Sequence, residues 1–296
     1  MVKMNVNIFH FPVFYHQIIT LMDIQPDHVV LDGTCGEGGH AELILKLLSS
    51  EGHYIGLDKD NAILSIAQKR LLPYHKSFNL IHSSYAESKT ALKSLSIQKV
   101  DRILLDLGLS MYHIRSEGRG FSYQSDALLD MRFDQSSPAM TAFEIIHTLP
   151  EEELSEILRE YGEESYANKI ARSIVITRKT SLIKTCQDLS QLILRVKPFT
   201  GHIHPATKTF QALRIAVNQE LTDLKKFLPD VPYLLNTGGR IGVISYHSLE
   251  DRIIKRFFQD QASLEILNKK VITPTLEEIN LNPASRSAKL RMAVLL

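Results

Sequence analysis

A glycine-rich turn between a short apolar segment and a helical segment constrains this chain most. Residues 28–40, HVVLDGTCGEGGH, predict a buried strand, a tight turn and the start of a helix. Glycine has no Cβ, so such a turn lets the backbone approach a ligand closely, and the helix start offers unpaired N–H groups. Twenty residues after Gly38, Asp58 ends a second predicted strand, residues 53–58. A carboxylate there can accept hydrogen bonds from ribose hydroxyls, which indicates a nucleoside-containing cofactor.

The spacing leaves open which cofactor this is. Gly36, Gly38 and Ala41 satisfy the dinucleotide pattern G-x-G-x-x-[GA], which keeps NAD as an alternative. Asp32, at the end of the first strand, favours S-adenosyl-L-methionine (AdoMet), because a carboxylate repels a pyrophosphate but attracts an ammonium group. In a purely structural alternative, the glycines only let a helix pack closely on a sheet.

Strand and helix signals alternate over the first hundred residues, which predicts an α/β fold with a doubly wound, mostly parallel sheet. From about residue 110 the rhythm breaks, and only helical periods follow until the sheet signals resume at residues 239–246. We therefore expect a sheet domain interrupted by an all-helical insertion. The expected segments are residues 1–109 and 217–296 for the sheet domain, and residues 110–216 for the insertion.

The composition is that of an ordinary globular protein, with 23% charged and 44% apolar residues. No run approaches the ~18 apolar residues that cross a bilayer. The two cysteines, Cys35 and Cys186, form no disulfide framework and no metal motif. The N-terminal residues lack a signal-peptide pattern, so we expect a cytoplasmic protein.

The net charge of +1 hides a strong asymmetry. Residues 142–164 carry eight acidic residues and one Arg, whereas residues 165–219 carry nine Lys or Arg and one Asp. The basic stretch either pairs with its acidic neighbour or forms a phosphate-binding face. In the second case Lys208 and Arg214, at helical spacing, are candidate RNA contacts.

Other polar residues also suggest contacts with a substrate. Arg119 and Arg132 lie in a long helix-poor stretch whose Arg and aromatic content fits phosphate contact and base stacking, although Arg132 could instead pair with Asp130. His247 is a candidate general base, unless the run from Ser248 to Asp251 is only a helix capping box. His202 and His204 have no third ligand at matching spacing, so no metal is expected.

The end of the fourth predicted strand, residues 101–107, is the candidate reaction centre. Asp106 ends this strand and Ser110 follows it, directly before the expected insertion. Because ligands of open α/β sheets lie at the carboxyl ends of the strands, a cofactor and a substrate would meet there. Asp106 could alternatively act only as a helix cap.

Several segments of the chain strongly resemble one known family, RsmH/MraW. The likeness runs from about Pro12 to Leu295 and rests on these strings: DGTCGEGGH, LLDLGLS, RGFSY, LLDMRFD, YGEESYANKIARSI, HPATKTFQALRIAVNQEL, GGRIGVISYHSLEDRIIKRF and NPASRSAKLRMAVL. The family comprises bacterial AdoMet-dependent methyltransferases that methylate N4 of a cytidine in 16S rRNA. The resemblance therefore implies AdoMet rather than NAD, and a class I, Rossmann-like methyltransferase fold with a helical insertion.

The resemblance also implies roles for individual residues. The family's AdoMet contacts fall on Gly38, Gly39, His40, Asp58, Tyr85, Asp106 and His113. Tyr85 stands where the family usually has Phe, and His113 where it usually has Gln. The implied reaction is an in-line methyl transfer to cytosine N4 in the decoding region of the small ribosomal subunit. The amine needs a proton acceptor, for which Asp106, Ser110 or a backbone carbonyl of the loop after Asp106 is a candidate. No metal and no membrane partner are implied, and the sequence leaves monomer and homodimer open.

Overall fold

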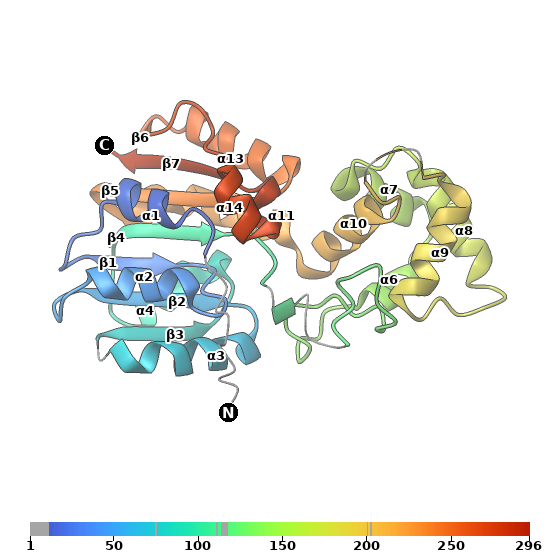
Figure 1. Ribbon diagram of the computed structural model, residues 1–296, viewed down its shortest axis with the longest axis horizontal. Coiled ribbons are helices and arrows are strands. Elements are labelled where there is room, and N and C mark those ends of the chain that lie inside the picture. The colour runs from blue at the N-terminus through green and yellow to red at the C-terminus, as the bar shows by residue number, and fades with distance from the viewer. Residues whose placement is uncertain (1–11, 75, 111, 114–117, 200, 202) are drawn as a thin grey trace. The chain divides into compact units, whose positions relative to one another are not determined.

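The computed structural model describes residues 12–74, 76–110, 112–113, 118–199, 201 and 203–296. The chain divides into two compact units (Figure 1). The sheet unit comprises residues 1–110 and 222–296, and the helical unit comprises residues 111–221. Within the described ranges, no helix is long and apolar enough to cross a membrane.

The sheet unit contains one seven-stranded sheet in the order β3-β2-β1-β4-β5-β7-β6. Strands β1 to β5 pair in parallel, and β7 runs antiparallel to both of its neighbours. The order reverses between β1 and β4, which is the switch point where open α/β sheets bind ligands. The strands are β1 (Val29–Asp32), β2 (His53–Asp58), β3 (Phe78–His82), β4 (Val100–Asp106), β5 (Leu235–Ser245), β6 (Leu264–Ile266) and β7 (Lys289–Leu295).

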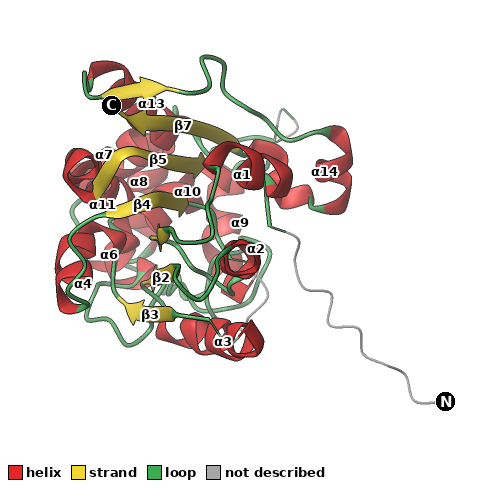
Figure 2. Cartoon of the chain, turned by 90° about the vertical axis from the view of Figure 1, so that its left-hand side faces the viewer, coloured by secondary structure: helices red, strands yellow, loops and turns green. Residues whose placement is uncertain are grey.

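Helices cover both faces of this sheet, which explains why its central strands are apolar throughout (Figure 2). One face packs against α1 (Tyr15–Met22), α2 (Gly39–Leu47) and α3 (Asn61–Leu71). The other packs against α4 (Ser88–Ser94), α11 (Glu220–Phe227) and α13 (Ser248–Asp260). The shorter helices are α12 (Val231–Leu234), α14 (Leu276–Leu281), η1 (Leu72–Tyr74), η2 (Tyr85–Glu87), η3 (Leu228–Asp230) and η4 (Pro283–Ser287).

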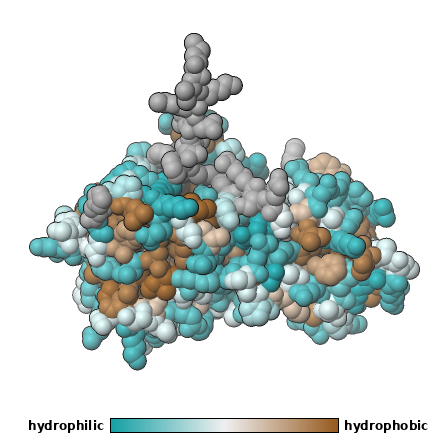
Figure 3. All heavy atoms as spheres, turned by 90° about the horizontal axis from the view of Figure 1, so that it is seen from below, coloured by the Kyte–Doolittle hydropathy of each residue, from teal (hydrophilic) through white to brown (hydrophobic). Residues whose placement is uncertain are grey.

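The edge of the sheet at β3 is incompletely covered. Its apolar residues Phe78, Leu80 and Ile81 are only half-buried. On the face drawn in Figure 3, hydrophobic atoms gather on the sheet unit among hydrophilic ones. The four strands nearer the centre, by contrast, contribute fully buried side chains such as Leu31, Ile55 and Leu105.

The helical unit has its own hydrophobic core. Thr141 and Thr185 begin two of its helices with capping boxes. The core continues through Leu213 and Val217 in the last helix, so the unit ends later than the boundary expected at residue 216. Its helices are α6 (Ala142–Thr148), α7 (Glu151–Gly162), α8 (Ala167–Thr177), α9 (Cys186–Val196) and α10 (Thr207–Asn218).

Gly33→Ala should destabilise the sheet unit by about 1–3 kcal/mol, as overpacked cores generally do. A Cβ at Gly33 would lie 2.4 Å from Leu105 Cδ2 and 2.7 Å from Tyr85 Cβ. Urea unfolding followed by circular dichroism measures the effect. The matched control is Gly39→Ala, whose Cβ would meet no atom closer than 3.5 Å and would stand in the first turn of α2. Equal stability of the two variants would contradict the packing argument.

Candidate active site

Three aspartates end neighbouring parallel strands at one edge of the sheet. Asp32 ends β1, Asp58 ends β2 and Asp106 ends β4. Because these strands are parallel, their carboxyl ends lie at the same edge. Tyr246 and His247 follow β5 there as well. The structure thus brings the strand ends singled out in the sequence together.

The glycine-rich loop joins β1 to α2 at this edge. Gly36 and Gly38 have φ values of 53° and 82°, in the left-handed region that glycine adopts without strain. Gly38 is the N-cap residue of α2, and no side chain caps the helix start. Gly36 N and Gly38 N are bonded within the protein, to Asp58 and to the Cys35 carbonyl oxygen, so the helix start after Gly38 is the part of the loop that suits a polar cofactor.

Asp58 ties this loop to the second strand. Its Oδ2 accepts a hydrogen bond from Gly36 N at 2.8 Å, and its Oδ1 accepts one from Asp60 N at 2.9 Å. An ionised carboxylate has about four acceptor positions, and two of those of Asp58 bind these backbone N–H groups. Asp58 thus shapes the loop as well as standing where the ribose contact is predicted.

Asp32 is almost completely buried, at 1% exposure. Its Oδ1 accepts from Thr34 N at 3.0 Å, and its Oδ2 accepts from the Tyr54 hydroxyl at 2.8 Å. Burial raises the pKa of Asp32 to about 6, although His40 and these hydrogen bonds act in the opposite direction. The sequence reasoning missed Tyr54, because a tyrosine inside an apolar strand looks like ordinary core.

Asp106, like Asp58, is half-buried rather than sealed from solvent, with 22% of its side chain exposed. Its backbone N donates to Thr34 Oγ1 at 2.6 Å, and Gly108 N donates to its Oδ1 at 3.3 Å. Nδ1 of the buried His40 lies 3.7 Å from Asp106 Oδ2, while His40 Nε2 lies 2.9 Å from the Val13 carbonyl oxygen. The His40 side chain therefore faces Asp106.

Tyr246, which the sequence analysis placed at a strand end but gave no role of its own, hydrogen-bonds Asp106. Burial, and after it the Asp106 charge and that hydrogen bond, raise the pKa of Tyr246 well above its usual value. Tyr246 N in turn donates to Glu250 Oε2 at 2.9 Å. The signal available in the sequence was the position of Tyr246 directly after β5.

His247 is the N-cap of α13 and forms a capping box with the buried Glu250. Its Nε2 lies 3.1 Å from Glu250 Oε1. The capping box expected from Ser248 to Asp251 is therefore wrong by one residue. The side chain of His247 performs a structural task, and its role as a base or substrate contact stays a prediction.

Three further candidates have different surroundings. Tyr85 begins η2 after β3, is nearly buried, and packs edge-on against Phe227 with ring centroids 5.5 Å apart. Ser110 is half-buried at the end of the first segment of the sheet unit. His113 belongs to the helical unit, where it stacks on Phe133 with centroids 5.1 Å apart. The cofactor contact of His113 stays a prediction.

Arg119 and Arg132 stabilise the loop that carries them. Arg119 is buried, and its guanidinium donates to the carbonyl oxygens of Arg132 and Phe133. Arg132 forms a bidentate pair with Asp130, at 2.7 and 3.0 Å. These contacts support the alternative of an internal Arg–Asp lattice. Contact of Arg119 and Arg132 with RNA remains a prediction.

Lys208 and Arg214, on α10, are also engaged within the helical unit. Lys208 Nζ donates to the Glu163 carbonyl oxygen at 2.8 Å. Arg214 pairs with Glu220 through two hydrogen bonds, at 2.8 and 2.9 Å. Contact with RNA, still a prediction for both, would compete with these bonds. His202, considered above as a metal ligand, lies outside the described residues.

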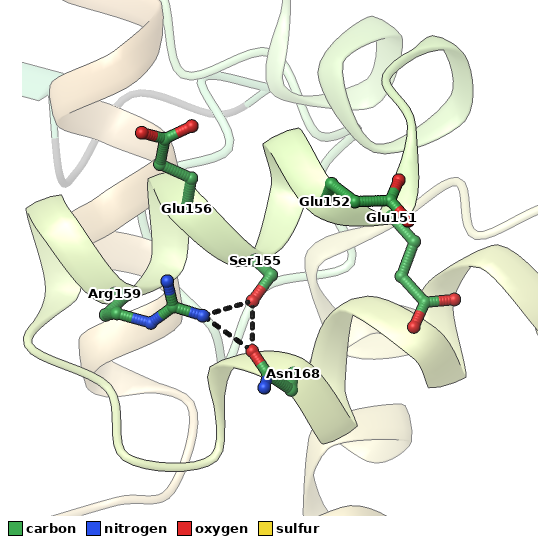
Figure 4. A pocket seen from close by; sticks show the side chains of 6 residues that line it. All are labelled: Glu151, Glu152, Ser155, Glu156, Arg159 and Asn168. Atoms are coloured by element: carbon green, nitrogen blue, oxygen red, sulfur yellow. Dashed lines mark hydrogen bonds between the residues drawn. The ribbon is translucent and has the colours of Figure 1, made fainter.

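A pocket of about 420 Å³ on the helical unit is acidic rather than basic (Figure 4). Three glutamates of α7, Glu151, Glu152 and Glu156, line it. Arg159 donates to Ser155 Oγ at 3.2 Å and to Asn168 Oδ1 at 2.8 Å, so its charge is held at the pocket wall. Such a lining repels phosphate.

Asp58→Ala should weaken AdoMet binding by about 1.5–3 kcal/mol, the range for hydrogen bonds to a charged group. The variant loses the predicted ribose acceptor and the Gly36 tether. Calorimetric titration with AdoMet measures the change. The control is Asp27→Asn, which removes the charge of an exposed residue before β1. An unchanged affinity in Asp58→Ala would exclude the ribose assignment.

Asp32 should make part of the stability pH-dependent. Its folded-state pKa of about 6 lies above the ordinary 3.8, so the folded state keeps a proton that the unfolded state loses between about pH 4 and 6. The free energy of unfolding therefore falls as pH rises through this window, by up to about 3 kcal/mol. Asp32→Asn should lack this component when urea unfolding is compared at pH 4 and 6.5. Parallel pH profiles of the two proteins would contradict the assignment.

Comparison with known proteins adds relatives of named activity. The chain is 44% identical over 96% of its length to the ribosomal RNA small subunit methyltransferase H of Dictyoglomus thermophilum, of which it covers 95%. It is 43% identical over 96% of its length to the enzyme of the same name from Persephonella marina, of which it covers 98%.

The solved structures are more distant. An rRNA methylase from Streptococcus thermophilus aligns over 95% of this chain and 93% of its own, at 10% identity and a TM-score of 0.45. The fold assignment accordingly rests on the strand order described above. The MraW methylase family matches residues 7–295, which confirms AdoMet over NAD as the cofactor, and the chain belongs to that family.

Proposed function

We propose that this protein methylates N4 of one cytidine in the decoding region of small-subunit (16S) rRNA, with AdoMet as methyl donor. The observation that carries the proposal is an accessible carboxylate, Asp106, at the switch point of a methylase-family sheet. Relatives that share more than 40% of the sequence are named as small-subunit rRNA methyltransferases. The target base and atom come from the family resemblance.

The glycine loop fits the cofactor by its own geometry. Gly38 and Gly39 open α2 without a side-chain cap, and Asp58 holds the loop from the neighbouring strand. Gly38, Gly39, His40, Asp58 and Tyr85 would hold AdoMet. When bound, AdoMet supplies an electrophilic methyl group on a sulfonium.

Asp106 has the chemistry that the acceptor amine needs. The lone pair of cytosine N4 is delocalised into the ring, so the amine must lose a proton as its bond to the methyl carbon forms. The Asp106 carboxylate can take that proton, with Ser110 as the second candidate. Tyr246 hydrogen-bonds this carboxylate, and His40 Nδ1 lies 3.7 Å from it. We expect the positioning of the amine against the methyl group to accelerate the reaction more than the proton transfer does. Well-oriented reactants reach effective molarities of ~10⁵–10⁸ M, whereas a general base contributes about 10²–10⁴-fold.

The target cytosine must leave its stack to reach this edge. Enzymes that act on a base take single-stranded nucleic acid or flip the nucleotide out of a duplex. A methyl-transfer assay tests the reaction: small subunits that lack the modification receive labelled AdoMet, and mass spectrometry identifies the modified nucleoside. Label in N4-methylcytidine supports the proposal, and label in any other nucleoside overturns it.

Asp106→Asn should lower single-turnover methylation by about 10²–10⁴-fold, the usual contribution of a general base. An amide keeps the oxygen that accepts from Gly108 N but cannot take a proton. Rapid-quench assays measure the rate, a melting curve measures folding, and Asp27→Asn is the charge-matched control. A normal rate in Asp106→Asn would remove Asp106 from the chemistry, and unfolding at room temperature would mark it as structural.

A further inference from the structure

Helix α13 exposes a row of positive charges. Arg252, Lys255 and Arg256 are all exposed, and spacings of three and four residues place them on one side of the helix. The opposite side carries Ile254 and Phe258, which are buried in the core of the sheet unit. We call the three cations the α13 basic face.

Two cations of this face, Lys255 and Arg256, are available to a partner. Among the residues that the structure describes, Lys255 and Arg256 form no hydrogen bond and no ion pair. By contrast, Arg132 and Arg214, which looked equally basic in the sequence, each pair with a carboxylate. An unpaired exposed cation keeps its full attraction for a polyanion.

Strand β7 adds two cations beside the first turn of α13. Lys289 Nζ lies 3.3 Å from Asp251 Oδ2, and Arg291 Nε lies 2.7 Å from Asp251 Oδ1. Burial alone would raise the pKa of Asp251, but these two cations hold it below its usual value. One carboxylate at the first turn of α13 thus faces two cations of β7.

The position of the helix links this face to the reaction centre. α13 begins at Ser248, three residues after the carboxyl end of β5, and β5 is paired in parallel with β4, which ends at Asp106. At 1.5 Å per residue, Arg252 and Arg256 lie about 6 and about 12 Å along the helix from Ser248. A chain of phosphates bound along α13 would therefore lead to the edge that carries Asp106.

We infer that the α13 basic face binds the RNA phosphate backbone next to the target nucleotide. The inference rests on the proposed function, since it takes RNA as the substrate. An acidic protein fits less well, because protein interfaces need apolar or aromatic residues at their centre, and α13 contributes none of the large hydrophobic residues found exposed in the described chain. Phosphate contacts need only cations.

The test compares Lys255→Ala/Arg256→Ala with a control of equal charge, Lys69→Ala/Lys93→Ala, in the full chain. Lys69 and Lys93 are exposed cations on α3 and α4. Fluorescence anisotropy with a labelled transcript of the decoding region gives affinity at several salt concentrations. Loss of two phosphate contacts should reduce the slope of log affinity against log salt by about 1.4–1.8, while AdoMet affinity stays unchanged. Lys255→Arg/Arg256→Lys should restore the wild-type slope.

Two results would overturn the inference. One is a slope equal to that of the control variant, which would show that no phosphate contacts this face. The other is an unchanged slope with the transcript but weaker association with whole small subunits, which would identify a protein partner. The binding experiment with the transcript does not depend on methyl transfer. The proposed function is tested separately, by identifying the nucleoside that the wild-type protein methylates. Failure of the α13 inference can therefore be distinguished from failure of the proposed function.

Discussion

The hydrogen bond from Gly36 N to the Asp58 carboxylate is the contact on which the site depends. Glycines let the backbone of such a loop approach a ligand closely, but they also make the unfolded loop more flexible. Folding must therefore pay a larger entropy cost to order it. Parallel pairing of β1 with β2 places a carboxylate beside the loop, and Asp58 thereby restrains it without a side chain from the loop itself. The sheet topology, more than the loop sequence, holds the cofactor site in shape.

Three aspartates at one sheet edge take different tasks because their burial differs. Asp32 is sealed from solvent and bound by Tyr54, so its pKa rises and its charge is a cost to the fold. Asp58 accepts hydrogen bonds from two backbone N–H groups. Asp106 keeps solvent access while His40 and Tyr246 orient it. Of the three, only Asp32 is closed to a ligand, whereas Asp58 and Asp106 are both half-buried.

The alternating strands and helices were predictable, since buried parallel strands are apolar runs and their helices are amphipathic. The structure adds α1, β6 and α14, which are short and gain stability from tertiary contacts rather than from pattern. Phe14, before α1, is fully buried in a left-handed conformation that no periodicity signals. The strand-end aspartates of the site were predictable from position, but Tyr54 and Tyr246 were not, because sequence spacing does not show which buried hydroxyl meets which carboxylate.

Charge counts along the sequence located basic segments, but they do not show which of the cations are already bound within the protein. The stretch from residue 165 to 219 has the largest positive excess, yet four of its nine cations are bound to groups of their own unit: Arg178, Lys197, Lys208 and Arg214. The α13 basic face has only three cations in a segment of ordinary charge. An ion pair formed within the protein must be broken before phosphate can replace it, which removes much of the gain from counterion release. For recognition of RNA, the number of cations without a carboxylate partner therefore matters more than net charge.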